Sequence, residues 1–144
     1  MKRLFLLLLF TLTFVSITNA QQTSLLSKEV MNLNEIIKKN TKPSSDLDAV
    51  FSLDEKNRIL NLNLSKGKPF PASKEETLEM FSLMKGAIPA AIIVSAYRIS
   101  KNDLGSIALL KYLVDENYKI EVTITDSNKE SISYEMTAKE LMTQ

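Results

Sequence analysis

Residues 87–125, AIPAAIIVSAYRISKNDLGSIALLKYLVDENYKIEVTIT, decide how this chain folds. The stretch begins as an almost uncharged apolar segment, continues through a second apolar run, and closes on a regular alternation of apolar and polar residues. The alternation separates the apolar Tyr118, Ile120, Val122 and Ile124 from Lys119, Glu121, Thr123 and Thr125. A period of two is typical of a β-strand with one buried face. We expect this stretch to supply the core of a small α+β domain that the other elements cover.

Two β-hairpins are predicted, one at each end of the domain. Residues 118–125 and 131–136 alternate in polarity and flank the turn-forming sequence DSNK at 126–129. Earlier in the chain, residues 49–53 and 58–64 flank the turn DEKN at 54–57. Strands joined by short turns pair antiparallel. The sequence therefore predicts an antiparallel sheet of about four strands packed against several helices.

An amphipathic helix is expected over residues 24–39. Its apolar side chains recur at spacings of three and four, which places them on one face: Leu26, Val30, Leu33 and Ile37. The opposite, polar face is expected to carry Lys28, Glu29, Asn34 and Lys38. That face mixes both signs of charge, whereas helices at a membrane surface are usually basic. We interpret the segment as a helix packed on the surface of the domain.

A second helix is predicted to start at a capping box formed by Ser73 and Glu76. Its buried stripe is expected to comprise Leu78, Phe81 and Met84, widened by Met80 and Leu83. Gly86 is expected to end it in the left-handed conformation.

The segment from Pro89 to Ile99 fits two structures. Its β-branched residues suit a strand, whereas its alanines and the position of Pro89 suit the first turn of a helix, which we favour. Residues 104–116 are predicted to form another helix, with Ile107, Leu110, Leu113 and Val114 inward. A further capping box at residues 137–140 predicts a short terminal helix.

The first twenty residues have the layout of a secretory signal peptide. Lys2 and Arg3 precede an apolar run from Leu4 to about Val15, and a polar, small-residue segment then ends at Ala20. An uncleaved membrane anchor is the alternative, but the apolar run is shorter than the roughly 20 residues that a span needs. We expect residues 1–20 to be a signal peptide and residues 21–144 a single α+β domain, periplasmic or secreted and not held in a membrane after cleavage.

The composition argues against several kinds of partner and chemistry. The chain has 18 basic and 17 acidic residues, and this balance gives no reason to expect nucleic acid as a partner. The absence of cysteine means that no disulfide supports the fold. Because the chain has no His and no Cys, it lacks the histidine base of serine and cysteine triads and the usual ligands of zinc sites. We predict no cofactor, no metal and no catalytic residue.

The leading hypothesis is an exported, non-catalytic binding domain for a protein partner or a small ligand. Phe70, Tyr97 and Arg98 are the predicted contact residues, since aromatic residues and arginine often anchor interfaces. Phe70 lies between two prolines, and the alternative is that it only pins its loop to the core.

Two other functions stay open. One is a hydrolase that uses paired carboxylates, with or without calcium or magnesium; the neighbouring acids are Asp46 with Asp48, Asp54 with Glu55, and Asp115 with Glu116. The other is a membrane-tethered or self-associating structural protein. The sequence identifies neither the ligand nor the oligomeric state.

Overall fold

The computed structural model describes residues 25–42 and 45–141. The predicted signal peptide at 1–20 lies outside these residues. The elements, in chain order, are a first helix at 25–40, β1 (Leu47–Asp54), β2 (Ile59–Lys66), α2 (Lys74–Leu83), α3 (Ala87–Ile99), α4 (Asp103–Asp115), β3 (Lys119–Thr125), β4 (Ser131–Thr137) and the 3-10 helix η1 (Ala138–Leu141).

The four strands form one sheet in the order β1-β2-β3-β4. Both predicted hairpins are present and antiparallel, with Phe51 opposite Leu62 in the first and Val122 opposite Tyr134 in the second. The expected α+β fold with a four-stranded sheet is thus confirmed. The sheet is mixed, however, because β2 and β3 run parallel at its centre. Three helices separate these two strands, so the turn rule that governs the hairpins does not apply to them.

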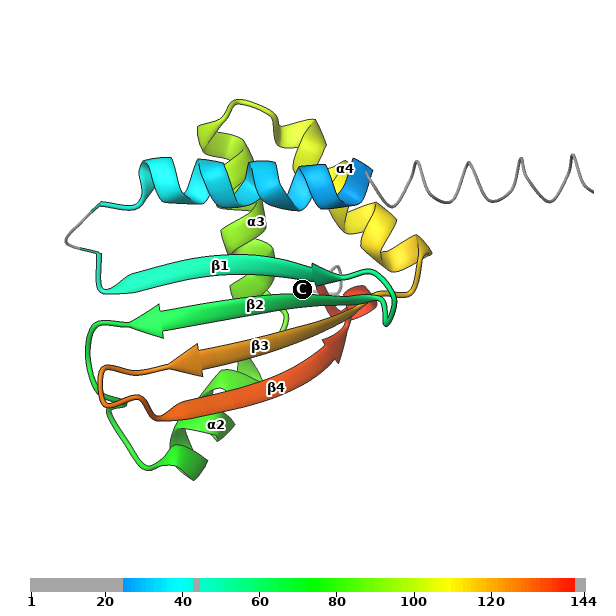
Figure 1. Cartoon of the computed structure of the whole chain (residues 1–144). Coiled ribbons are helices and arrows are strands. Elements are labelled where there is room, and N and C mark those ends of the chain that lie inside the picture. Colours follow the sequence, from blue (N-terminus) through cyan, green and yellow to red (C-terminus); the bar gives the residue numbers. More distant parts are fainter. Residues whose placement is uncertain (1–24, 43–44, 142–144) are drawn as a thin grey trace, which may run out of the picture.

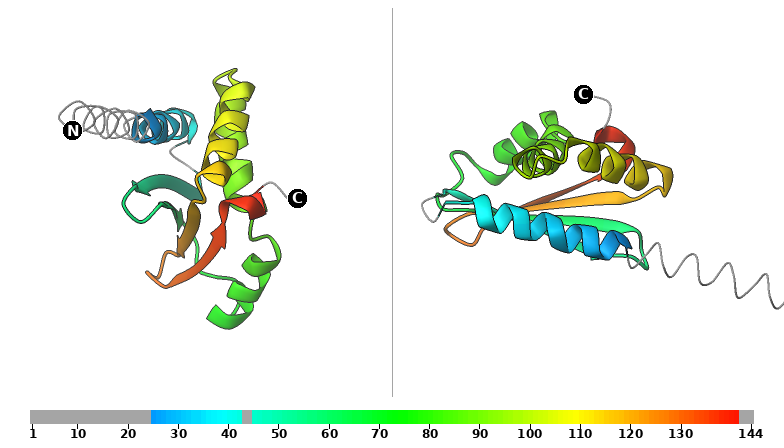
Figure 2. Two further views of the ribbon diagram at one scale, coloured as in Figure 1. Left: turned by 90° about the vertical axis from the view of Figure 1, so that its right-hand side faces the viewer. Right: turned by 90° about the horizontal axis from the view of Figure 1, so that it is seen from above.

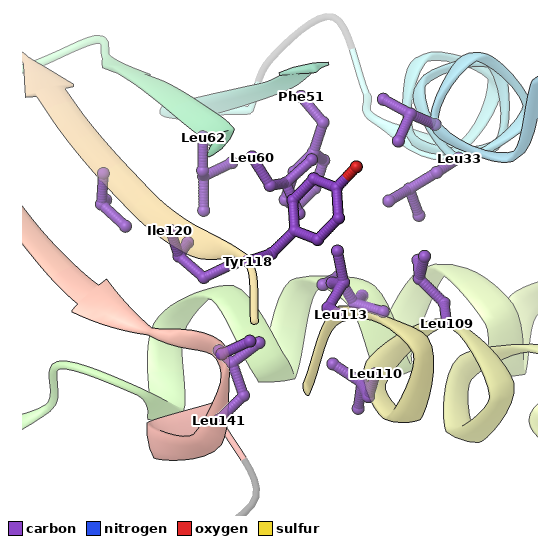
Figure 3. Packing of buried hydrophobic residues seen from close by; sticks show 14 of the residues in the cluster. Leu33, Phe51, Leu60, Leu62, Leu109, Leu110, Leu113, Tyr118, Ile120 and Leu141 are labelled. Carbon is purple, nitrogen blue, oxygen red and sulfur yellow. The ribbon is translucent and has the colours of Figure 1, made fainter. Parts of the chain in front are cut away.

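Helices α2, α3 and α4 cover one face of the sheet, and the first helix lies along the β1 side (Figures 1 and 2). The strands alternate accordingly: Leu60, Leu62, Ile120 and Val122 are fully buried, whereas Asn63, Ser133 and Glu135 are exposed on the other face. Tyr118 lies in the middle of the core, among Phe51, Leu33 and Leu113 (Figure 3). The stretch from 87 to 125 therefore does supply much of the buried interior.

The ambiguous segment is helical. Residues Ala87–Ile99 form α3, which buries Ile93, Ala96 and Tyr97. Helix α4 also forms as predicted, but Ile107 points outward and Leu109 is buried in its place. At the C-terminal end, Glu140 accepts the Thr137 N–H at 2.6 Å, as the predicted capping box requires, although the turn that follows is a 3-10 helix.

The burial predicted for α2 is wrong. Its capping box is present, with the Ser73 hydroxyl and the Glu76 carboxylate each accepting the other's backbone N–H. Yet only Thr77 is buried, and the expected stripe is largely exposed: Leu78, Met80, Leu83 and Met84. Gly86 is right-handed, with φ of −83°, because it caps the N-terminus of α3 and does not stop α2 with a left-handed turn. Helix α2 lies beside β4, at the border of the helical layer, where its outer side is uncovered (Figure 1).

Among the described residues, no single helix has the length and apolar composition to cross a membrane. Only α2 and α3 taken together meet the criterion, and they are bent by 61° relative to each other.

Candidate ligand-binding site

A cavity of about 480 Å³ opens between the first helix and α4. Ligand pockets commonly measure about 300–1,000 Å³ and combine apolar walls with a few polar groups. The residues that line this cavity are Leu25, Leu26, Glu29, Asn102, Gly105, Ala108, Leu109 and Tyr112. Glu29 is the one charged side chain among them, so we call this cavity the Glu29 pocket.

The α4 side of the Glu29 pocket depends on a glycine. A Cβ on Gly105 would lie 2.5 Å from Asn102 Nδ2 and 2.7 Å from Tyr97 Cε1, closer than atoms can approach without a shift. Asn102 is the N-cap of α4, and its Oδ1 accepts the Gly105 N–H at 3.2 Å. The sequence at the start of α4 thus lets the helix backbone lie directly against the Tyr97 ring.

Glu29 is held at the pocket by a tyrosine from the core. Tyr97 has no exposed surface, and its hydroxyl donates a hydrogen bond to Glu29 Oε1. Burial raises the pKa of Tyr97 strongly, and the hydrogen bond to Glu29 and its negative charge add to the effect. The hydroxyl therefore remains a donor at all physiological pH values. Glu29 itself is half-buried and forms no ion pair with any residue in 25–42 or 45–141.

Tyr112 provides an aromatic wall of the pocket and lies near the charges of Glu116, Arg58 and Glu55. Its ring centroid lies 6.4 Å from that of Tyr118. Burial is the main cause that raises the pKa of Tyr112, followed by the negative charge of Glu116. Arg58 opposes that rise, and its Nη1 donates to the Glu116 carbonyl at 2.9 Å.

A second cavity, of about 290 Å³, lies between the end of the first helix, β1 and α3. None of its lining residues is charged. Its polar residues are Asn40 and Thr41, which donate to the carbonyls of Ile36 and Ile37, and Ser95. It therefore offers an apolar depression without a charged group that would select a ligand.

The three contact residues predicted from sequence are not brought together in either cavity. Phe70 is half-buried against the core, its N–H donates to Asp126 Oδ2 at 3.0 Å, and Lys66 Nζ lies 5.6 Å from its ring centroid. These contacts agree with the pinned-loop alternative. Tyr97 is fully buried, so it acts on the pocket only through Glu29. Arg98 is exposed in the last turn of α3.

Sequence reasoning missed Glu29 because the assignment of the first helix's faces was wrong. Glu29 lies three residues after Leu26 and four before Leu33, so helical spacing does place it beside the buried stripe. The same holds for Asn34, four residues after Val30. The apolar stripe alone was read as the contact face, and the polar residues at its border were overlooked.

Three of the acids named for the hydrolase alternative are bonded to side chains of other types. Asp46 pairs with Lys68 at 2.5 Å, Asp115 pairs with Lys111 at 2.5 Å, and Asp54 accepts from Asn57. No group of three or more metal-binding side chains is present within 25–42 and 45–141. The arrangement around Glu29 supports binding of a positive group beside an apolar one and provides no second acid for acid/base chemistry. Comparison with protein-family models, curated proteins and solved structures found no match for this chain.

Proposed function

We propose that this chain is an exported, non-catalytic binding domain, and that the Glu29 pocket takes a small amphipathic ligand with a protonated amine and a short apolar body. The observation that carries the proposal is the carboxylate of Glu29, fixed by buried Tyr97 at the wall of an otherwise apolar cavity. The place of action, periplasmic or outside the cell, follows from the predicted leader.

The charge of Glu29 accounts for the expected selectivity. A half-buried carboxylate without an ion pair gains most from a cation that shares its poorly solvated surroundings. Tyr97 occupies Oε1 and leaves Oε2 available. The walls from Leu25, Ala108 and Leu109 offer apolar surface to the remainder of the ligand. An anionic ligand would meet Glu29 with like charge and is expected to be rejected.

Titration with a matched set of simple probes tests the proposal. n-Hexylamine, hexanol and hexanoate differ only in the head group, and binding can be followed through the amide resonances of Gly105 and Ala108. Hexylamine is expected to bind with a Kd of about 1 mM, a reasonable affinity for so small a ligand. Hexanol should bind at least tenfold more weakly and hexanoate not at all.

The variant Glu29→Gln should weaken hexylamine binding about tenfold or more, because a charge-assisted hydrogen bond is worth roughly 1.5–3 kcal/mol. Glu35→Gln is the matched control: Glu35 is on the same helix, with 67% of its side chain exposed, and pairs with Lys39. Equal binding of amine and alcohol, or an unchanged Kd in Glu29→Gln, would show that Glu29 does not select the ligand and would refute the proposal.

A further inference from the structure

The two edge strands of the sheet differ in whether their outward backbone groups have hydrogen-bond partners. At the β1 edge, the Asn34 side chain bonds both backbone polar groups of Phe51, at 2.7 and 2.8 Å. At the β4 edge, the register shows which groups face outward. Ala138 N donates to Tyr118 O and Asp126 N donates to Glu130 O, so the even-numbered residues of β4 bond to β3. In an antiparallel pair the alternate residues then direct their N–H and C=O away from the sheet. These are Ser131, Ser133, Glu135 and Thr137.

Within the described chain, the outward N–H of Thr137 is bonded by Glu140, whereas no protein group bonds the outward N–H groups of Ser131, Ser133 and Glu135. Natural edge strands are usually protected by lysine, proline or a bulge. The sequence of β4, SISYEMT, has neither residue type, and its pairing with β3 is continuous. The edge is thus open for strand addition.

Uncovered apolar side chains of α2 and its C-cap lie beside this open edge. Helix α2 packs next to β4, with the Tyr134 hydroxyl 3.4 Å from the Lys85 carbonyl just after the helix (Figures 1 and 2). Its exposed apolar residues are Leu78 at 37%, Met80 at 48%, Leu83 at 80% and Met84 at 47%. Exposed apolar surface of this kind often marks a protein interface.

The geometry points to a second copy of this chain as the occupant: two β4 strands pair antiparallel about a two-fold axis at Ser133 and form one continuous sheet. In this register Ser133 faces its own copy, and Ser131 faces Glu135 of the second copy. All outward groups of these three residues are satisfied, and the Thr137–Glu140 bond is kept. The two Glu135 carboxylates face serines and not each other, so no like charges meet at the seam.

The core side of the same register is also complementary. Ile132 is buried and Tyr134 half-buried, and they alternate with the outward residues. Pairing about Ser133 places Ile132 opposite Tyr134 of the second copy, and aromatic with β-branched pairs stabilise neighbouring strands. An extended peptide could satisfy the backbone groups but would bring no helix to cover α2. A second copy brings its own α2 to the seam, so it fits both features.

Analytical ultracentrifugation from micromolar to millimolar concentration tests this dimer. The wild type is expected to dimerise in this range. Ser133→Pro removes one outward N–H without touching a bond to β3, and should remain monomeric throughout. Ser133→Thr keeps the N–H and should dimerise like the wild type. A wild type that stays monomeric at millimolar concentration overturns the inference. This holds also if the β4 edge binds a different partner.

Leu83→Gln and Leu104→Gln form a second, matched test that leaves the strands intact. Leu83 is 80% exposed on α2 and Leu104 is 79% exposed on α4. Helix α4 lies at the opposite end of the helical layer from α2 (Figure 1). Leu83→Gln should raise the dimer Kd at least tenfold, whereas Leu104→Gln should leave it unchanged. Circular dichroism confirms that each variant folds. If Ser133→Pro fails to fold, the leucine pair decides alone. Equal effects of the two substitutions, or a folded Ser133→Pro dimer, place the interface elsewhere and overturn the inference.

Discussion

Asn34 on the first helix forms with Phe51 on β1 the two backbone hydrogen bonds that a neighbouring strand would form. Its Nδ2 donates to the Phe51 carbonyl at 2.7 Å, and its Oδ1 accepts the Phe51 N–H at 2.8 Å. One amide side chain thereby satisfies both backbone polar groups of an edge residue that is only 2% exposed. This contact fixes the first helix against the sheet, and with it one wall of the Glu29 pocket.

Asn34→Ala is therefore expected to destabilise the fold. The substitution leaves the Phe51 N–H and C=O without their partner, at a cost of about 1–3 kcal/mol. Urea unfolding followed by circular dichroism measures the change. Asn63→Ala, at an exposed position on the open face of the sheet, should shift the unfolding free energy by no more than about 0.5 kcal/mol. Equal losses in both variants would contradict the role assigned to Asn34.

Gly105→Ala should also destabilise the protein, although alanine favours helix by up to about 1 kcal/mol. The added methyl would lie 2.7 Å from the ring of Tyr97, which is buried and cannot move aside. Overpacking of this kind costs about 1–3 kcal/mol, so the loss exceeds the helical gain. Gly67→Ala is the control, because the nearest atom to its Cβ is 3.4 Å away. A Gly105→Ala variant as stable as the wild type would show that α4 can move away from Tyr97.

Stability should fall at alkaline pH, in part through Tyr134. Burial raises the pKa of Tyr134 to about 12, against 10.0 for a free tyrosine. Above pH 10 the unfolded chain loses this proton and the folded chain keeps it, so the stabilisation present at lower pH is lost as the pH rises towards 12. The slope reaches at most about 1.4 kcal/mol per pH unit for one tyrosine. Tyr134→Phe should make the alkaline loss shallower in unfolding experiments between pH 9 and 12; an identical slope would contradict the prediction.

Asp126 should contribute stability that disappears in acid. Burial opposes its ionisation, but hydrogen bonds from the N–H groups of Phe70, Glu130 and Asn128 lower its pKa overall. The contribution is present above the unfolded pKa of about 3.9 and is lost as the pH falls through the lower folded value. Asp126→Asn should lower the Tm at pH 7, because asparagine keeps only one acceptor oxygen and its NH2 group cannot accept the bonds made to the other oxygen. The difference from wild type should shrink below pH 3.5; a constant difference at every pH would argue against ionisation as the cause.

Local elements were predictable because their signals are local. The alternation of residues 118–125 and the turn residues that follow fix the second hairpin without reference to the rest of the chain. The capping box at Ser73 likewise predicts where α2 begins. The parallel pairing of β2 with β3 was not predictable, because no turn connects them and their apolar alternation fits either direction equally well.

Burial was predicted less well than secondary structure. The apolar spacing of α2 is that of a core helix, yet whether such a face is covered depends on how far the sheet extends beneath it. The pocket was missed for a related reason: Glu29 and Tyr97 are far apart in sequence and meet only after the first helix packs on α3. Tyr97 was selected as a contact residue, but its burial and its bond to Glu29 are properties of the packed domain.

The parallel junction of β2 and β3 has a consequence for how the chain folds. Each hairpin can form outward from its own turn, because the paired residues are close in sequence. The two halves of the sheet can join only after α2, α3 and α4 have returned the chain alongside β2. Pairing of β2 with β3 is accordingly the step with the largest loop-closure entropy. We expect this pairing, and not the formation of the hairpins, to limit the folding rate.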